Sequence, residues 1–388
     1  MFINLRKTLA YFTKDSYFIC KSNVSFSHYF STSVKKQQPV TTPTVSEFLM
    51  NKHHFSPQSA SRVASVLTRM RNPQKSDSVL SFLKDNGFSV TQLEKIVEYR
   101  PRFLGASLEK VIKPKIKIFQ DLGFSKNDIT EIIASNPDIF HRSMNNRIIP
   151  SLSVLKGLLG SNVELVKVLT VPSWFVISDM ENTLAPNFKF LQSCGIPKEY
   201  IIWLMYKYPR TLLHKPESMR KFVEYIDQVG IKRSSKMYIH AIRVLSSMSS
   251  ESWELKLEAF RNLGFSEDDI VVTFRKAPQV FAVSVNKMKK VKEVLLSTGK
   301  YDAMCIVKNP TSLGCSIEKR YKPRLQVLSI LESKNLIKNW PSFSVMYQSN
   351  NANFLKKFVN PYLNEFRDGC LDMSAFSGKK SLKQTPSA

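Results

Sequence analysis

Cysteine is scarce in this sequence, and long apolar runs are missing from it. Its five cysteines are scattered over 388 residues, without a C-x-x-C pair or a histidine-rich partner segment. Such a distribution argues against a disulfide framework and against a zinc site, and it suits a reducing compartment. No uninterrupted apolar run approaches the roughly 18 residues that a bilayer requires. The sequence therefore predicts no bound metal and no membrane partner.

The motifs of common enzymes are missing too. The sequence has no G-x-x-x-x-G-K-[ST], no G-x-G-x-x-G after a strand, no H-E-x-x-H and no G-x-S-x-G. Acidic residues cluster where helices are expected to begin, and capping explains them there. The histidines have no carboxylate or cysteine at ligand spacing. These absences predict a protein that is not an enzyme and binds no cofactor.

Acidic residues are outnumbered by basic ones. The chain has 57 Lys and Arg against 31 Asp and Glu, a formal net charge of +26, and 43% of its residues are hydrophobic. The apolar fraction is large enough for a folded core. The basic excess favours a polyanionic partner, most commonly nucleic acid. The alternative is an ordinary basic organellar protein without such a ligand.

The first thirty residues differ from the rest. Residues 1–30 carry four basic residues and one acid, Asp15, and they are rich in serine and aromatic residues. This composition is typical of a transit peptide, and the junction of Phe30 and Ser31 resembles mitochondrial cleavage sites. We expect a mitochondrial transit peptide over 1–30, with the chloroplast stroma as the alternative to the mitochondrial matrix. A polar linker is expected over 31–44.

Seven of the twelve glycines fall on one period. A glycine after a leucine-rich stretch supplies the left-handed conformation that ends a helix. Capping signatures for a new helix follow, as in Ser125-x-x-Asp128 and Ser266-x-x-Asp269. The period therefore marks the boundary between successive helical units. The glycines lie 34 to 37 residues apart, at Gly87, Gly123, Gly160, Gly195, Gly230, Gly264 and Gly299.

The motif P-x-x-[LF]-x-x-S recurs in step with the glycines. Its proline should end a first helix, because the residue before a proline avoids the α region. The Leu or Phe then enters the core, and the serine begins a second helix. Val244 occupies the proline position in the fifth repeat. The motif prolines are Pro101, Pro137, Pro172, Pro209, Pro278 and Pro310.

A further proline lies inside four of the expected second helices. We expect it to kink the helix or to mark a tighter 3-10 entry turn. These prolines are Pro114, Pro150, Pro186 and Pro323.

The periodic glycines, the P-x-x-[LF]-x-x-S motif and the further prolines, which are the landmarks of each repeat, together predict an all-α fold. About seven or eight degenerate repeats of about 35 residues should stack as an α-solenoid, because neither helix of a unit can bury its apolar stripe alone. We expect the solenoid over 45–365, with degenerate repeats as caps at both ends. A disordered tail is expected over 366–388.

Two stretches, DLGFSKNDITEIIASNPDIFHRS and NLGFSEDDIVVTFRKAPQVFAVS, show the landmarks most clearly. They resemble the repeats of the mitochondrial transcription termination factor (mTERF) family, and DSVLSFLKDNGFSVTQLEKIVEYRPRFLGAS is similar to its plant branch. The resemblance covers about 45–365. It implies a left-handed superhelix whose positively charged concave side can hold duplex DNA. It also implies roles in organellar transcription and, in plants, sometimes in intron splicing or other RNA steps. Repeats three to five depart from the pattern by losing prolines or charge.

Basic residues recur nine, twelve and fourteen positions after the motif proline. The first two positions share one helix face. The third lies on that face only if the nearby proline changes the rotation of the chain around the helix axis. We expect each cation to meet one phosphate; the alternative is a solvated outer face. Repeat three has Asp179 and Glu181 instead, which interrupts this series of basic residues. The predicted contacts, with nearby cations of repeats two and four, are Lys110, Lys113, Lys115, Arg142, Arg147, Arg210, Lys215, Arg220, Lys221, Lys287, Lys290, Lys292, Lys319, Lys322 and Arg324.

The sequence thus predicts an mTERF-type organellar protein that binds double-stranded DNA as a monomer and regulates transcription or its termination. The preference for DNA over RNA rests on the resemblance alone. One alternative is an RNA-binding factor for organellar intron splicing or ribosome assembly. The other is a protein-interaction scaffold that binds no nucleic acid.

Overall fold

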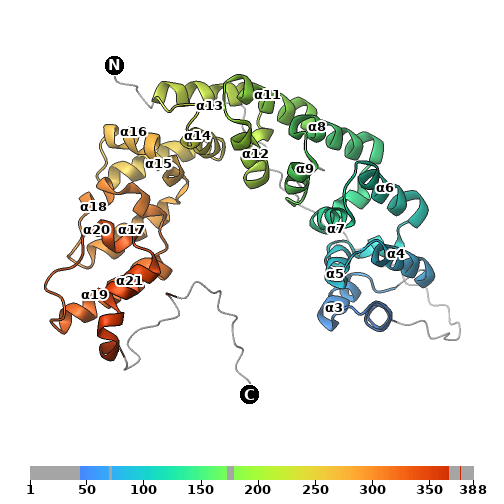
Figure 1. Ribbon diagram of the computed structural model, residues 1–388, viewed down its shortest axis with the longest axis horizontal. Coiled ribbons are helices and arrows are strands. Elements are labelled where there is room, and N and C mark those ends of the chain that lie inside the picture. Colours follow the sequence, from blue (N-terminus) through green and yellow to red (C-terminus); the bar gives the residue numbers. More distant parts are fainter. Residues whose placement is uncertain (1–43, 70–71, 173–178, 367–375, 377–388) are drawn as a thin grey trace, which may run out of the picture. The chain divides into compact units, whose positions relative to one another are not determined.

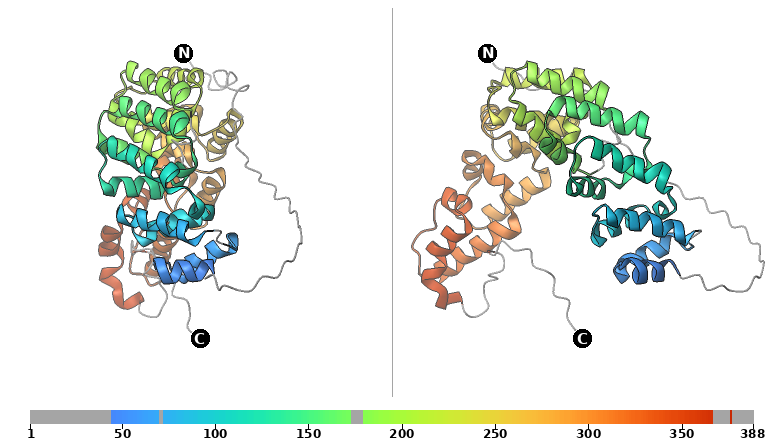
Figure 2. Two further views of the ribbon diagram at one scale, coloured as in Figure 1. Left: turned by 90° about the vertical axis from the view of Figure 1, so that its right-hand side faces the viewer. Right: turned by 45° about the vertical axis from the view of Figure 1, so that its right-hand side comes forward.

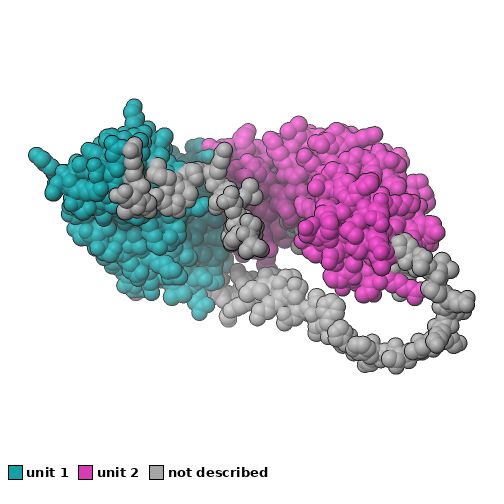
Figure 3. All heavy atoms as spheres, turned by 90° about the horizontal axis from the view of Figure 1, so that it is seen from below, with its two compact units in different colours: residues 1–16, 220–388 teal, residues 17–219 magenta. Residues whose placement is uncertain are grey.

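The computed structural model describes residues 44–69, 72–172, 179–366 and Phe376. Contacts divide these residues into two compact units (Figure 3), an N-terminal unit up to Met219 and a C-terminal unit from Arg220 onward. The boundary falls inside helix α13 (Pro216–Val229). The predicted transit peptide, nearly all of the predicted linker and all of the tail beyond Phe366 except Phe376 lie outside the described residues.

Each unit is built from pairs of helices. In the N-terminal unit, first helices pack beside first helices and second helices beside second helices, which gives two rows (Figures 1 and 2). A short entry segment, α2 (Val45–Glu47) with η2 (Phe48–Lys52), precedes them. The first helices are α3 (Pro57–Val66), α5 (Val90–Tyr99), α7 (Lys126–Ser135), α9 (Asn162–Leu169) and α12 (Lys198–Lys207). The second helices are α4 (Pro73–Asp85), α6 (Lys113–Asp121), α8 (Ile149–Leu159) and α11 (Ala185–Ser193).

The C-terminal unit continues the same pattern. Its first helices are α14 (Lys236–Ser246), α16 (Glu267–Lys276), α18 (Ala303–Lys308) and α20 (Phe343–Gln348). The second helices are α15 (Ser250–Asn262), α17 (Val285–Leu296), α19 (Lys322–Ser333) and α21 (Asn351–Phe358), and the 3-10 segment η12 (Asn360–Phe366) follows. The described residues contain helices and no strand. The prediction of an all-α solenoid is therefore confirmed.

The periodic glycines have the backbone that the sequence predicts. Each of the seven has a positive φ, between +63° and +96°, and no other described glycine does. The expected capping boxes also form: the Ser125 hydroxyl accepts from the backbone N–H of Asp128, whose carboxylate in turn accepts from the Ser125 N–H. The sequence therefore specified both the end of one helix and the start of the next.

Two neighbouring glycines provide a matched test of this role. Gly160 ends α8 with a φ of +83°, whereas Gly157 lies inside the same helix, and a Cβ at either position would have nothing within 4 Å. Gly160→Ala should destabilise the N-terminal unit by about 1 kcal/mol because alanine is strained at positive φ. Gly157→Ala should stabilise it by roughly 0.5–1 kcal/mol. Urea denaturation of both variants measures the difference, and equal shifts of one sign would contradict it.

The motif prolines begin short 3-10 turns. In each described turn the Leu or Phe three residues after the proline is almost fully buried, at 2% exposure or less, as predicted. Phe281, for example, packs in a cluster with Trp253 and Phe274. The turns are η3 (Pro101–Gly105), η5 (Pro137–His141), η8 (Pro209–Leu213), η9 (Pro278–Ala282) and η10 (Pro310–Gly314).

The second prolines correct one expectation. They are preceded by wider π-helical turns and not by tighter 3-10 turns. In an α-helix, the ring of Pro114 would clash with the carbonyl of Lys110, and its nitrogen could donate no hydrogen bond. A turn with one extra residue removes that clash, and Ile112 N donates to Ser107 O five residues back at 3.2 Å. The turns are η4 (Leu108–Ile112), η6 (Met144–Ile148), η7 (Met180–Leu184) and η11 (Ile317–Tyr321).

Candidate nucleic-acid interface

Most of the predicted phosphate contacts gather where second helices begin. Lys110 lies in η4 and Lys113 starts α6, Arg147 lies in η6, and Lys319 lies in η11. The positive end of a helix dipole lies at the N-terminus, where acidic residues stabilise a helix and cations do not. Helix stability therefore does not explain these cations. Together with the dipole, they favour the binding of anions.

Two of the predicted contacts are instead buried. Lys115 is 7% exposed, and its Nζ donates to Phe140 O at 2.6 Å. Burial lowers the pKa of Lys115 to about 8. Arg324 is fully buried, and its guanidinium donates to Met346 O at 2.6 Å. Both residues occupy the fourteenth position after the proline, which the π turn rotates toward the next repeat. We therefore remove both from the set of phosphate contacts.

The burial of Lys115 belongs to a general feature that sequence reasoning missed. A buried polar side chain of one second helix donates to a backbone carbonyl in or beside the 3-10 turn of the next repeat. These carbonyls point toward the neighbouring helix and need a donor, because an unpaired buried polar group is costly. The residue type of the donor varies, so no fixed sequence motif marks this hydrogen bond. The pairs are Ser76 with Leu104 O, Lys115 with Phe140 O, Asn187 with Leu212 O and Lys256 with Val283 O.

Four further predicted contacts already have protein partners. Lys287 Nζ donates to Gly314 O and Lys292 Nζ to Asn262 O, both at 2.8 Å. Lys113 pairs with Glu109 at 2.5 Å and Lys322 with Glu318 at 2.8 Å, one helical turn apart. The two ion pairs are exposed, and such pairs contribute little to stability. They can therefore open at small cost if a phosphate replaces the carboxylate.

The remaining nine predicted residues reach solvent, and Arg142 is the least exposed of them. They divide between the two units. The N-terminal unit holds Lys110, Arg142, Arg147, Arg210 and Lys215, and the C-terminal unit holds Arg220, Lys221, Lys290 and Lys319.

The series of predicted basic contacts is interrupted in repeat three, as the sequence predicts. Asp179 caps the second helix of that repeat by accepting from Asn182 N at 3.1 Å, and Glu181 lies in the first turn. Both acids reach solvent. Repeat three therefore contributes negative charge at the place where repeats one, two and seven contribute cations.

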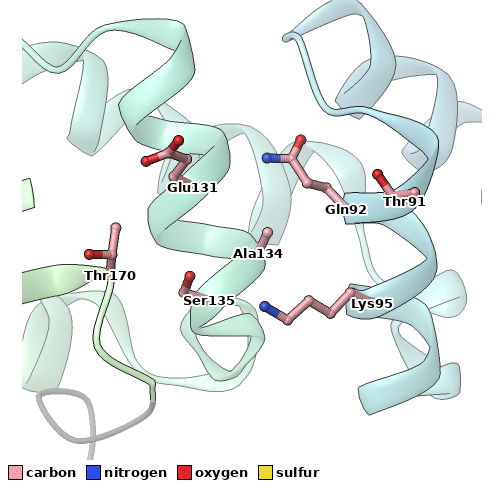
Figure 4. Close-up of a pocket in the computed structure, with 7 residues that line it drawn as sticks. All are labelled: Thr91, Gln92, Lys95, Glu131, Ala134, Ser135 and Thr170. Atoms are coloured by element: carbon pink, nitrogen blue, oxygen red, sulfur yellow. The ribbon is translucent and has the colours of Figure 1, made fainter. Parts of the chain in front are cut away.

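A pocket of about 360 Å³ lies between α5 and α7 (Figure 4). Lys95 of α5 and Glu131 of α7 both line it, together with Gln92, Ser135 and Thr170. The opposite charges of Lys95 and Glu131 leave the wall without a net positive field. We therefore do not assign a phosphate to this pocket.

Two of the tryptophans, Trp253 and Trp340, are engaged within the protein, and Trp174 lies outside the described residues. Trp253 is 2% exposed and lies in the aromatic core, and Trp340 Nε1 donates to Glu332 at 2.8 Å. Within the described ranges no group of three or more His, Cys, Asp and Glu residues could hold a metal. No described helix combines the length and the apolar character that crossing a bilayer requires.

The fold and the interface together define a helical-repeat protein with cations at the N-termini of its second helices. The sequence model of the mTERF family matches residues 33–247 and 228–355, which is most of the chain. The chain therefore belongs to the mTERF family, a family of nucleic-acid-binding proteins with transcription-related roles.

One curated relative is the transcription termination factor MTERF8, chloroplastic, of Arabidopsis thaliana. The two sequences are 22% identical over 151 residues, which is 39% of this chain and 30% of the relative. The matched part is therefore a minor share of the relative's length. The relative is a plant organellar protein by name, as the sequence resemblance implies.

Proposed function

We propose that this protein binds double-stranded DNA in an organelle through the exposed cations of its second helices, and thereby regulates transcription or its termination. The observation that carries the proposal is the placement of Lys110, Arg147, Lys290 and Lys319. All four reach solvent. Lys110, Arg147 and Lys319 lie in the π-helical turns that open second helices, where cations do not serve helix stability, and Lys290 lies midway along α17. Exposed cations of this kind suit the negative charge of a phosphate backbone.

The proposal includes the location and the mode of action. The basic and serine-rich segment 1–30 supports import into mitochondria, while the name of the Arabidopsis relative keeps the chloroplast as the alternative. The protein acts as a monomer without a cofactor, and it works by occupying nucleic acid and not by catalysis.

A salt titration tests the proposal. Binding of the chain without residues 1–30 is measured against duplex DNA, single-stranded RNA and double-stranded RNA at several salt concentrations. We expect the tightest binding to duplex DNA, with a log–log slope of about −0.9 for each phosphate contact. Tighter binding to either RNA would support an RNA-binding factor. Weak binding to all three, without a dependence on salt, would support a protein-interaction scaffold.

A further inference from the structure

One residue beyond the last helical segment is described, and it is buried. Phe376 is 6% exposed, although the stretch that follows it in the sequence, SGKKS, has no apolar side chain. Its ring is stacked on that of Phe354 in α21, with the ring centroids 6.0 Å apart and 11° between the planes. Its carbonyl oxygen accepts from Asn351 Nδ2 at 3.1 Å. Both the side chain and the backbone of Phe376 therefore bind to α21.

The same kind of hydrogen bond joins successive repeats earlier in the chain. Lys115 Nζ donates to Phe140 O, 25 residues further on. Asn187 Nδ2 donates to Leu212 O, again across 25 residues. These two acceptors belong to the core residues that follow a motif proline by three positions. The bond to Phe376 O also spans 25 residues, so Phe376 takes the place of the core residue of a further repeat.

The ring contact has a counterpart as well. In repeat six the core residue Phe281 packs on Phe260 of α15, with the ring centroids 4.4 Å apart. Lys256 of the same helix donates to a carbonyl just after that 3-10 turn. One aromatic residue and one polar donor of a second helix thus bind the turn of the next repeat. In α21 these two roles belong to Phe354 and Asn351.

The sequence around Phe376 retains the spacing of the repeat motif but not its punctuation. Met373 occupies the proline position, which Val244 occupies in repeat five. Lys379 occupies the serine position, which Lys215 occupies in repeat four. With both landmarks replaced, only the phenylalanine remains, and a single phenylalanine does not reveal a repeat in the sequence.

The binding site for Phe376 is positioned by the preceding repeat. Arg324 Nη2 of α19 donates to Asn351 Oδ1 at 2.9 Å, which leaves Asn351 Nδ2 to donate to Phe376 O. The Arg324 guanidinium also lies over the ring of Phe354, at 4.7 Å from its centre. No repeat follows α21 among the described residues. We call Arg324, Asn351 and Phe354 the α21 site.

We propose that the α21 site is a docking site for Phe376 of the same chain, which covers the end of the C-terminal unit in place of a further repeat. The inference is independent of nucleic-acid binding. The last helices of a repeat array need a capping element, because no neighbour buries their apolar face. A phenylalanine ring supplies a large apolar area for this purpose. Attachment to the same chain favours docking within one molecule, because it gives a high effective concentration.

Hydrogen exchange in α21 tests the docking, with the chain without residues 1–30 as the parent. In Phe376→Ser, the amides of α21 should exchange at least about tenfold faster, because the burial of a phenylalanine side chain stabilises by more than this factor. Phe376→Leu should keep most of the protection. Leu363→Ser is the matched control, because Leu363 is an apolar residue of η12 that is 50% exposed, and it should leave the exchange unchanged. Equal exchange in Phe376→Ser and the parent chain would overturn the proposal.

A photoreactive group at position 376 tests the contact itself. Phe376 is replaced by benzoyl-phenylalanine, and mass spectrometry locates the link that forms on irradiation. We expect a link to α21 at or beside Phe354. Mixing with isotopically labelled chains shows whether the link lies within one molecule. A link to another element, or a link between two copies, would show that Phe376 does not dock on its own α21 and would overturn the proposal.

Discussion

Replacing Arg324 by methionine is expected to destabilise the C-terminal unit by about 2–4 kcal/mol. The guanidinium donates to Met346 O and Ser349 O at 2.6 and 2.8 Å, and to Asn351 Oδ1 at 2.9 Å. It also lies over the ring of Phe354 at 4.7 Å. Methionine fills similar space but leaves the buried Met346 O and the partly buried Asn351 Oδ1 without this donor, while Ser349 O keeps a longer bond of 3.3 Å from Arg320. An unpaired buried acceptor costs more than the lost bond alone.

Urea denaturation of the variant measures this loss. Lys319→Gln is the control, because it removes an exposed cation just before α19 and should change the free energy of unfolding by no more than about 0.5 kcal/mol. At temperatures where Arg324→Met remains folded, its salt slope on duplex DNA should equal that of the parent chain. A variant with normal stability and a shallower slope would restore Arg324 to the set of phosphate contacts.

Removing four exposed cations together is expected to have the largest effect on nucleic-acid binding. The variant replaces Lys110, Arg147, Lys290 and Lys319 by glutamine. If each contacts one phosphate, the log–log slope on duplex DNA becomes shallower by about 3.6. The affinity at low salt falls in proportion for every DNA sequence, because phosphate contacts carry no base information. Anisotropy titrations at several salt concentrations measure both quantities.

A matched variant shows whether position or total charge decides the result. Lys167, Lys207 and Lys276 lie in the last turns of first helices, and Lys338 lies outside the helices. All four are exposed, and none is among the predicted contacts. Replacing these four by glutamine lowers the net charge by the same amount. We expect only a small change in slope. Equal losses in the two variants would mean that the charge acts diffusely, and the proposed interface would then be wrong.

The local backbone could be predicted because single residue types determine it. Gly160 follows the last turn of α8 with positive φ, which glycine adopts without strain. Pro137 begins the turn η5 because the residue before a proline avoids the helical region. Ser125 caps α7 through a bond that its own hydroxyl makes. These effects act over a few residues, so their periodic recurrence also revealed the repeat.

The direction of the side chains in the second helices could not be predicted in the same way. The π turn before Pro114 shifts the phase of every later residue in α6. Lys115 consequently faces the next repeat and bonds to Phe140 O. Assigning helix faces as if the residues on both sides of the proline formed one continuous α-helix does not reveal this shift. In the sequence, a lysine that donates to a backbone carbonyl cannot be told from a lysine that is available to a phosphate.

The sequence by itself determined the helical repeat, its period, its caps and the family to which the chain belongs. Each follows from local conformational preference repeated along the chain. Only the tertiary structure decided which cations are available to a ligand, since burial depends on the neighbouring repeat. It buried Lys115 and Arg324 and left Lys110 and Lys319 exposed. The physical reason is that the exposure of a charged side chain depends on packing against residues about 25 positions away. The conformation of a turn depends only on the few residues within it.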